Sequence, residues 1–340
     1  MTVAVTALCE RSPSLSAADI VANLVPPQQF AQASFASYIP DDDFPSQVHA
    51  RDLLEGFASA STAATPGKLF GRKQKSEDVR PGVYLDGGFG VGKTHLLAAL
   101  WHAAPGRKKY FGTFLQYTSL VGALGYATAV EALRGSSLIC IDEFELDDPG
   151  DTMVMTRLLG ELVSTGTRVA ATSNTPPHAL GEGRFAAADF LREIQALAAH
   201  FETVRIDGTD YRKRTAVGSA AVLSPADLEK YVDSARDRGE SVTVDAFDDL
   251  LAHLATVHPS TYVRMIEGID AIAMTGVHVL TNQTDALRIV AFIDRVYDAQ
   301  IPVRSSGVPL SEIFGGDMIN GGYRKKYLRC MSRLIALTNS

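Results

Sequence analysis

The stretch 83-VYLDGGFGVGKTHLLAAL-100 constrains the fold more than any other part of this 340-residue chain. Gly87 is followed, after four residues, by Gly92-Lys93-Thr94, with a strand-like apolar segment before and a helix-like apolar segment after. Glycines let the backbone turn sharply and point its N–H groups at a phosphate, and the helix adds the positive end of its dipole. The pattern therefore predicts a phosphate-binding loop rather than a glycine-rich turn that binds nothing.

The residues of this loop have separate expected roles. Lys93 is expected to reach the β and γ phosphates of a nucleotide, and Thr94 to hold Mg²⁺ through its hydroxyl group. The positions expected to surround the nucleotide are Gly87, Gly88, Phe89, Gly90, Val91, Gly92, Lys93, Thr94 and His95. His95 is assigned no chemistry of its own, because a partly buried helical histidine is the more common situation.

Strand and helix patterns alternate from residue 83 to about residue 215. The expected strands are 83–87, 108–114, 137–144, 168–174 and 203–208. The middle strands are apolar almost throughout, as burial on both faces requires. This pattern predicts an α/β fold in which helices cover both faces of a parallel sheet.

The chain is expected to divide into three parts. Residues 1–25 are predicted to be an irregular N-terminal segment, residues 26–215 the nucleotide-binding core, and residues 216–340 a mainly helical C-terminal part. In the last part, helices are expected at 225–240, 244–258 and 321–338, and a strand–helix–strand unit at 277–306.

An acidic motif, 138-LICIDEF-144, follows the loop. Asp142 is expected to orient Mg²⁺ and Glu143 to polarise the attacking water. Carboxylates at the carboxyl end of a central strand lie where open α/β sheets bind their ligands. An acidic surface turn is the alternative, and the placement of the motif within an alternating fold favours the site.

The stretch 168-RVAATSNTPP-177 places a polar residue at the end of another apolar strand. Asn174 is expected to hydrogen-bond the γ phosphate and the lytic water, as in an additional-strand P-loop ATPase; a strand-ending asparagine in a turn is the alternative. Phosphoryl transfer also needs a cation against the developing charge. The candidates are Arg184, preferred, and Arg192, and either could instead form a surface ion pair. Tyr38 and Gln47 are candidates for the adenine pocket, with simple packing as the alternative.

Composition limits the partners. Lys and Arg number 32 and Asp and Glu 39, so the formal charge of −7 argues against polyanion binding by the whole protein. Cys9, Cys140 and Cys330 are far apart and lack metal spacing, which indicates reduced thiols in the cytoplasm. No apolar run approaches the roughly 20 residues of a membrane span. We therefore expect no direct membrane insertion.

With these motifs the chain resembles the ZapE-type AAA+ ATPases, bacterial cell-division proteins with mitochondrial relatives of the lactation-elevated type. The resemblance covers about residues 25–338, and its motifs are GGFGVGKTHLL, IDEFELDDPGDTMVMTRLLGELVSTGTRVAATSNTPPHAL, VRIDGTDYRKR and RCMSRL. It implies ATP rather than GTP, a homo-oligomeric ring with the site between subunits, and action on polymers of the tubulin-like protein FtsZ at the division septum.

The resemblance also concerns residues outside the phosphate-binding loop, the acidic motif and the strand that ends at Asn174. It implies that Arg288, in DALRIVAFID, reaches the nucleotide from the C-terminal part. Tyr211 and Arg212 match a family signature to which no chemistry is assigned. The chain departs from the family at 112–135, which is shorter and apolar here, and at 184–192, which lacks the usual leucine–glutamine–arginine run and proline. These departures concern the partner and the arginine finger rather than ATP binding.

The sequence is compatible with three functions. The favoured one is an Mg²⁺-dependent ATPase that remodels a protein partner in cell division or protein quality control. The alternative is an ATPase of the helicase-loader or initiator type, which would contact nucleic acid through basic residues at 68–75 and 324–333. The net charge and the lack of a helix-turn-helix pattern argue against it. A nucleotide-gated scaffold without catalysis is the third, and the presence of Glu143 argues against that.

Overall fold

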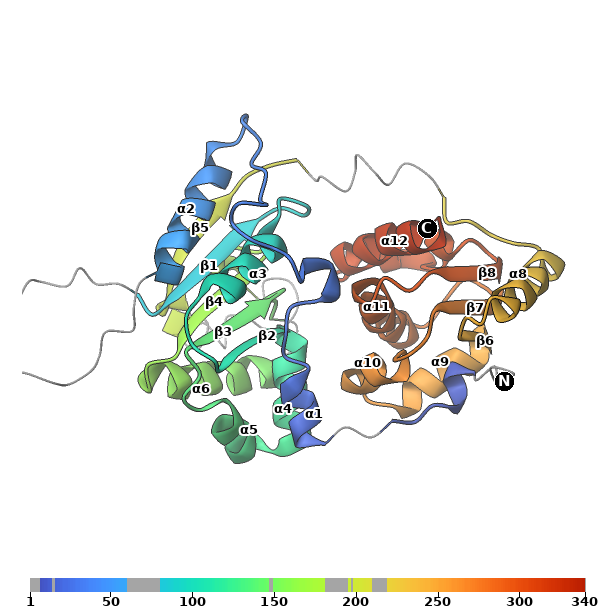
Figure 1. Cartoon of the computed structure of the whole chain (residues 1–340), viewed down its shortest axis with the longest axis horizontal. Coiled ribbons are helices and arrows are strands. Elements are labelled where there is room, and N and C mark those ends of the chain that lie inside the picture. Colours follow the sequence, from blue (N-terminus) through green and yellow to red (C-terminus); the bar gives the residue numbers. More distant parts are fainter. Residues whose placement is uncertain are drawn as a thin grey trace, which may run out of the picture. The chain divides into compact units, whose positions relative to one another are not determined.

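A computed structural model describes residues 7–13, 16–59, 80–146, 149–180, 195–196, 198–209 and 219–339. The chain forms two compact units (Figure 1). The core unit comprises Ala17–Pro26 and Phe30–Tyr211, and the C-terminal unit comprises Met1–Ser16, Pro27–Gln29 and Arg212–Ser340. Among the described residues, no helix has the length and apolar character needed to span a membrane.

The core unit is built on a five-stranded parallel sheet in the order β2-β3-β4-β1-β5. Its strands are β1 (Gly82–Gly87), β2 (Lys109–Thr113), β3 (Leu138–Asp142), β4 (Arg168–Ser173) and β5 (Phe201–Ile206). All five strands expected from the sequence are therefore present. Because β4 is inserted between β1 and β3, the end of β4 lies between the glycine-rich loop and the acidic motif.

Helices cover both faces of this sheet (Figure 1). The helices are α1 (Ala17–Ala22), α2 (Pro45–Ser59), α3 (Lys93–Ala103), α4 (Phe114–Leu124), α5 (Tyr126–Leu133) and α6 (Pro149–Ser164). On one face, α2 and α3 bury apolar side chains such as Leu85 and Leu96. On the other face, α4 and α6 pack against the sheet, α5 packs on both of them, and α1 packs on α4. The predicted α/β fold is confirmed.

The segment that departs from the family, 112–135, forms α4 and α5. Thr113 begins α4 with a capping box: its Oγ1 accepts from Gln116 N at 3.3 Å, and Gln116 Oε1 accepts from Thr113 N at 2.7 Å. Tyr117 then ties the helix to the sheet, because its hydroxyl donates to Cys140 O at 3.1 Å. The apolar character of the segment is explained by this packing.

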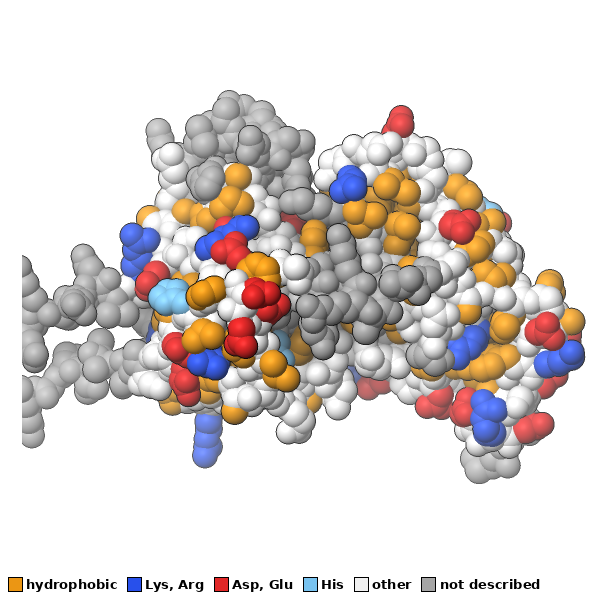
Figure 2. Space-filling view, turned by 90° about the horizontal axis from the view of Figure 1, so that it is seen from above, with side chains coloured by type: hydrophobic (Ala, Val, Ile, Leu, Met, Phe, Trp, Pro, Cys, Tyr) orange, Lys and Arg blue, Asp and Glu red, His pale blue; other side chains and the backbone are white. Residues whose placement is uncertain are grey.

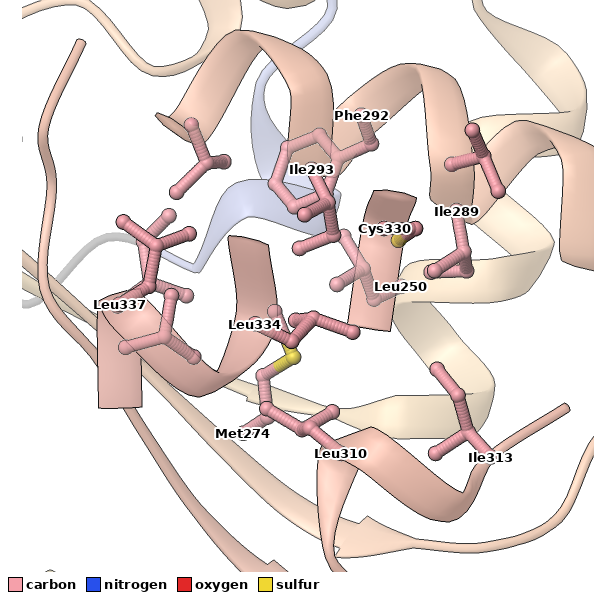
Figure 3. Close-up of a cluster of buried hydrophobic side chains, with 14 of the residues drawn as sticks. Leu250, Met274, Ile289, Phe292, Ile293, Leu310, Ile313, Cys330, Leu334 and Leu337 are labelled. Atoms are coloured by element: carbon pink, nitrogen blue, oxygen red, sulfur yellow. The ribbon is translucent and has the colours of Figure 1, made fainter. Parts of the chain in front are cut away.

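The C-terminal unit contains a second, three-stranded parallel sheet in the order β6-β7-β8. Its strands are β6 (Val242–Ala246), β7 (Ala271–Val277) and β8 (Val303–Gly307), and its helices are α8 (Pro225–Asp237), α9 (Phe247–Thr256), α10 (Tyr262–Met265), α11 (Gln283–Asp298) and α12 (Arg324–Thr338). Helix α8 covers one face, and α9, α11 and α12 cover the other. Figure 3 shows the apolar core between these helices and the sheet, which includes Leu250, Met274, Phe292 and Leu334.

Short 3₁₀ helices complete the described chain. They are η1 (Leu8–Glu10), η2 (Gln28–Phe30), η3 (Pro177–Ala179), η6 (Pro259–Thr261), η7 (Leu310–Glu312) and η8 (Gly316–Asn320).

Two details expected for the C-terminal unit were wrong. The helix expected at 244–258 begins only at Phe247, because the residues before it form β6. A strand was expected to begin at Val277. The observed strand, β7 (Ala271–Val277), ends there instead. Both errors have one cause. A strand's hydrogen-bond partners come from distant parts of the chain, and β-propensity depends on that context.

Residues 7–13 pack within the C-terminal unit. Leu8 is fully buried, and the carboxylate of Asp245 in β6 accepts from Leu8 N at 3.0 Å and from Cys9 N at 2.9 Å. Arg11 Nη1 donates to Met265 O and Glu267 O, each at 2.9 Å. These contacts join residues more than 230 positions apart, which no local sequence pattern indicates.

Candidate nucleotide site

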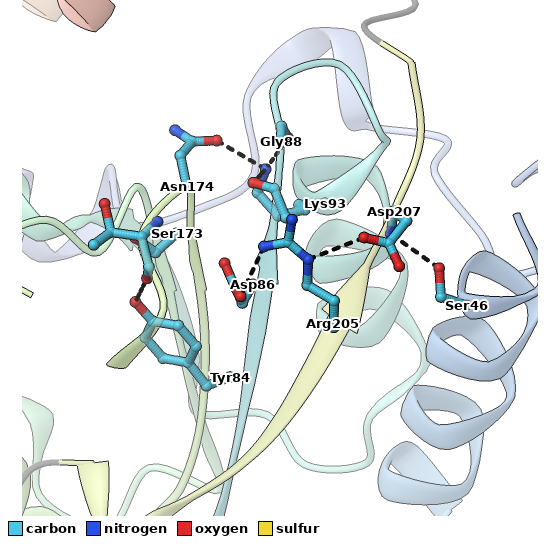
Figure 4. A network of polar contacts seen from close by, with 11 residues as sticks. Ser46, Tyr84, Asp86, Gly88, Lys93, Ser173, Asn174, Arg205 and Asp207 are labelled. Atoms are coloured by element: carbon cyan, nitrogen blue, oxygen red, sulfur yellow. Dashed lines mark hydrogen bonds and ion pairs between the residues drawn. The ribbon is translucent and has the colours of Figure 1, made fainter. Parts of the chain in front are cut away.

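The glycine-rich loop wraps around its own lysine. Lys93 begins α3 directly after Gly92, and its Nζ donates to Gly87 O at 2.9 Å and to Gly88 O at 2.5 Å. The same ammonium group donates to Asn174 Oδ1 at 2.9 Å (Figure 4). Gly88 is exposed, whereas Phe89 and Gly90 are half-buried and Val91 is buried. The structure therefore brings together Lys93 and Asn174, two residues that the sequence assigned separately.

Two loop positions require glycine. A Cβ atom on Gly87 would lie 2.3 Å from Ile206 O. Gly92 has a φ of +86°, in the left-handed region, and a Cβ atom there would lie 2.5 Å from Tyr38 Cε2. Tyr38 is buried beside the loop and donates from its hydroxyl to Val91 O at 2.9 Å. Tyr38, from the chain segment before α2, therefore packs against the loop and holds its backbone at Val91.

We expect Gly92→Ala to weaken nucleotide binding by at least about tenfold, because a left-handed backbone and a steric clash are each of order 1–3 kcal/mol. Titration with a fluorescent ADP analogue measures this. Gly122→Ala on α4 is the matched control, because nothing lies within 4 Å of its added Cβ. Equal affinity of the Gly92 variant and the wild type would contradict the assigned loop geometry.

Gln47 and His95 hold backbone segments around the loop. Gln47 Oε1 accepts from Asp41 N at 2.9 Å, and its Nε2 donates to Asp207 O at 2.9 Å. His95 Nε2 lies 3.1 Å from both Ser34 O and Ser37 Oγ. Burial raises the pKa of Tyr38 to about 12, so its phenol stays protonated. Tyr38 and Gln47 therefore both have structural contacts that hold the backbone around the loop.

The acidic end of β3 lies beside α3. Asp142 is buried, and its two carboxylate oxygens accept from Thr94 Oγ1 at 3.0 and 3.2 Å. Burial, and then the charge of Glu143, raises the pKa of Asp142 above its ordinary value. Hydrogen bonds from Thr172 and Thr94 and the charge of Lys93 act in the opposite direction. The contacts from Thr172, Thr94 and Lys93 therefore offset the burial of the Asp142 carboxyl only in part.

The end of β3 and the end of β4 are connected. Glu143 is half-buried and has a φ of +53°, in the left-handed region. Asn174 follows β4, and its Nδ2 donates to Glu145 Oε1 at 3.4 Å. Thus Lys93, Asn174 and Glu145 form a chain of contacts across the carboxyl edge of the sheet.

The remaining predicted residues belong to the C-terminal unit or lie outside the described residues. Arg288 belongs to α11 of the C-terminal unit and pairs with Asp285, with 2.9 Å between Nη1 and Oδ1. Arg184, Arg192, Tyr211 and Arg212 lie outside the described residues. All four stay predictions.

A second charged network, missed in the sequence, precedes the loop. Asp86 on β1 is buried and pairs with Arg205 on β5, with 2.9 Å between Oδ2 and Nη1. Arg205 also contacts Asp207, with 3.0 Å between Nε and Oδ1, and Asp207 N donates to Ser46 Oγ at 2.9 Å (Figure 4). A single aspartate in an otherwise apolar strand was the available signal. The network ties the strand before the loop to β5 and α2.

The oxygen atoms at this edge suit Mg²⁺. Thr94 Oγ1 and the Asp142 carboxylate are hard oxygen donors 3.0 Å apart, and the carboxylate is buried. No group of three or more His, Cys, Asp or Glu side chains within the described ranges could hold a metal by itself. In proteins, Mg²⁺ is usually bound by few side chains, and substrate phosphates and water complete its coordination. The residues present therefore fit this ion.

A phosphate loop after β1, an acidic motif after β3 and a polar side chain after the inserted β4 define a P-loop NTPase of the AAA+ class. The chain belongs to the AFG1-like ATPase family, whose family model matches residues 15–239 and 227–340. The ATPase class predicted from the sequence is thereby confirmed.

Two curated relatives agree with the predicted resemblance. Cell division protein ZapE of Escherichia coli (strain K12) is 27% identical over 364 residues, which cover 92% of this chain and 95% of that protein. Lactation elevated protein 1 homolog B of Danio rerio is 29% identical over 203 residues, which cover 52% of this chain and 39% of that protein. The solved structure of DnaI aligns with 53% of this chain and 94% of its own at 20% identity, with a TM-score of 0.40.

Proposed function

We propose that this protein hydrolyses ATP with Mg²⁺ and uses the nucleotide cycle to remodel a protein partner in cell division. The observation that carries the proposal is the meeting of Lys93 with Asn174, and of Thr94 with Asp142, at one edge of the core sheet. The similarity to a cell division protein over 92% of the chain supports the biological context. FtsZ polymer is the partner that this context favours.

The proposed chemistry uses residues of all three motifs. The N–H groups of the loop and the Lys93 ammonium bind the β and γ phosphates, and Asn174 orients the γ phosphate and the attacking water. The water oxygen attacks the γ phosphorus, its proton passes to the Glu143 carboxylate, and the bond from phosphorus to the ADP oxygen breaks. When bound, Mg²⁺ supplies positive charge against the phosphate oxygens. Thr94 and Asp142 hold it.

The Lys93 ammonium group donates to two loop carbonyls and to Asn174. Phosphate oxygens are strong, charge-assisted acceptors for the same group. The contact between Lys93 and Asn174 therefore links the loop to the γ-phosphate end of the site.

We propose that the protein acts as a homo-oligomeric ring in the cytoplasm, with recruitment to the division septum by its partner. The positive charge required at the transition state comes from Arg184, the first choice, or Arg192 of a neighbouring subunit. Arg288 is the candidate from the C-terminal unit. The family resemblance supports the ring.

Nucleic-acid handling is the less favoured function. Two of the basic residues on α12, Arg329 and Arg333, have side chains 7% and 13% exposed and pair with the buried Asp294. They are therefore not available to phosphates. On the face of the C-terminal unit drawn in Figure 2, basic side chains are few and are interspersed with acidic ones.

The proposal is tested by measuring ATP hydrolysis against protein concentration, alone and with FtsZ polymer or single-stranded DNA. We expect turnover to rise more than linearly with concentration, because subunits share the site, and to rise further with FtsZ. Stimulation by DNA alone would favour the helicase-loader function. ATP binding without hydrolysis in any condition would leave the scaffold.

A further inference from the structure

Thr172 on β4 contacts three successive residues of the acidic motif. Its side chain is 1% exposed, and its Oγ1 donates to Asp142 Oδ1. The same Oγ1 accepts from Glu143 N at 3.2 Å, and the Thr172 carbonyl accepts from Phe144 N at 2.6 Å. One residue therefore holds the carboxylate of Asp142 and the backbone on either side of Glu143.

These contacts begin where the regular pairing of β3 and β4 ends. The last backbone-paired residues of the two strands are Ile141 and Ala171. One residue later the chain must turn out of the sheet, and Glu143 adopts the left-handed φ of +53° that non-glycine residues rarely adopt. Such a conformation persists only where surrounding contacts determine it. The Thr172 hydroxyl provides one of these contacts at Glu143 N.

The hydroxyl is not needed to build β4. Valine has nearly the shape of threonine and an equal or better strand propensity, and the three residues before Thr172 in this strand, Val169, Ala170 and Ala171, are apolar. A hydroxyl in a buried strand is unfavourable unless it forms hydrogen bonds. Here it forms two, and both go to the acidic motif. These contacts indicate a role at the site rather than in the fold.

We propose that Thr172 is a positioning residue, whose hydroxyl fixes the metal-binding orientation of Asp142 and the backbone from which Glu143 projects. This inference rests on the proposed function, because it assigns Asp142 to Mg²⁺ and Glu143 to the attacking water. Thr94 also contacts Asp142, so loss of Thr172 weakens rather than abolishes the metal site. Thr172 has no contact with Lys93 among the hydrogen bonds described, so binding of the phosphates is retained.

The test compares Thr172→Val with Thr172→Ser in the full chain. For the valine variant we expect kcat for ATP to fall by about 10- to 100-fold, as for other residues that orient metal ligands. We expect KM to change by less than about threefold, because the loop contacts remain. The serine variant keeps the hydroxyl and should recover most of the loss.

Binding gives a readout that does not depend on hydrolysis. Electron paramagnetic resonance measures the affinity of Mn²⁺ in the presence of ADP, and we expect it to fall by about tenfold in the valine variant and to recover with serine. Thr203→Val, the same change at an exposed site on β5, is the matched control and should leave both readouts unchanged. Thermal unfolding without ligand confirms that each variant is folded.

Three outcomes would overturn the proposal. Wild-type kcat and Mn²⁺ affinity in the valine variant would show that the hydroxyl positions nothing. Equal defects in the valine and serine variants would indicate packing. A rise in KM with unchanged kcat would place Thr172 in substrate binding. If the wild-type protein binds ADP and Mn²⁺ without hydrolysing ATP, the proposed function fails, and the Mn²⁺ measurement still decides the role of Thr172.

Discussion

Replacing Glu143 with glutamine is expected to lower ATP turnover by about 10²- to 10⁴-fold, the usual contribution of general base catalysis, while ATP still binds. Glutamine has the size of glutamate but accepts no proton at neutral pH. Lys93 and the loop, which bind the phosphates, are unchanged. Phosphate release measures kcat, and titration with a fluorescent ATP analogue measures binding.

The control for this variant is Glu131→Gln on α5. Its carboxylate is 72% exposed and pairs with Arg134, with 2.9 Å between Oε2 and Nε. Turnover in the control should equal that of the wild type, because exposed ion pairs contribute little. Full turnover in the Glu143 variant would exclude it as the base. Glu145, which accepts from Asn174, would then be the next candidate.

A large loss of stability is expected when Asp294, in the C-terminal unit, is replaced by alanine. Its side chain is 9% exposed and pairs with Arg329, with 2.9 Å between Oδ2 and Nη2, and with Arg333. Asp294→Ala leaves two arginines buried without this partner. Loss of one member of a buried ion pair lowers the free energy of unfolding by about 3–5 kcal/mol. Urea denaturation followed by circular dichroism measures the change.

The single tryptophan helps to locate that effect. Trp101 lies on α3 of the core unit, so its fluorescence reports on the core, whereas circular dichroism reports on both units. We expect Asp294→Ala to move the circular dichroism transition to lower urea and to move the fluorescence transition less. Equal shifts of both would contradict a change confined to the C-terminal unit.

Two further variants test whether buried unpaired charge causes the loss of stability in Asp294→Ala. Asp233→Ala removes an exposed pair with Arg236 on α8 and should change stability by less than about 1 kcal/mol. Replacing Asp294, Arg329 and Arg333 together with apolar residues of similar size should restore most of the loss, because no charge is then left buried. A triple variant as unstable as Asp294→Ala would point to packing instead.

Low pH should also lower the stability of the folded protein through Asp294. Burial alone would raise the pKa of Asp294, but the charges of Arg329, Arg333 and Arg295 hold it below its ordinary value of 3.8. The lowered pKa stabilises the folded state above pH 3.8, and this contribution disappears as the pH falls through the lower folded value. The Asp294→Ala variant should therefore lose less stability than the wild type in that acidic range.

The sequence alone predicted the core unit well, because its motifs are local. Glycines, a lysine and a threonine at set spacing, between an apolar strand and an apolar helix, predict one loop geometry. A buried parallel strand is a continuous apolar run, which made the middle strands visible, and all five expected strands are present. The same reasoning placed Asp142 and Asn174 each at the end of an apolar strand, where open α/β sheets bind their ligands.

The tertiary structure alone decided which distant residues support that site. Thr172 looks like any strand residue until β4 is placed beside β3, and the pair of Asp86 with Arg205 requires β5 beside β1. The basic pattern of α12 suggested a surface for phosphates, yet the burial of Arg329 and Arg333 depends on Asp294 from α11. The physical reason is the same in each case. Spacing along the chain determines local conformation, whereas burial and partners depend on which elements pack together.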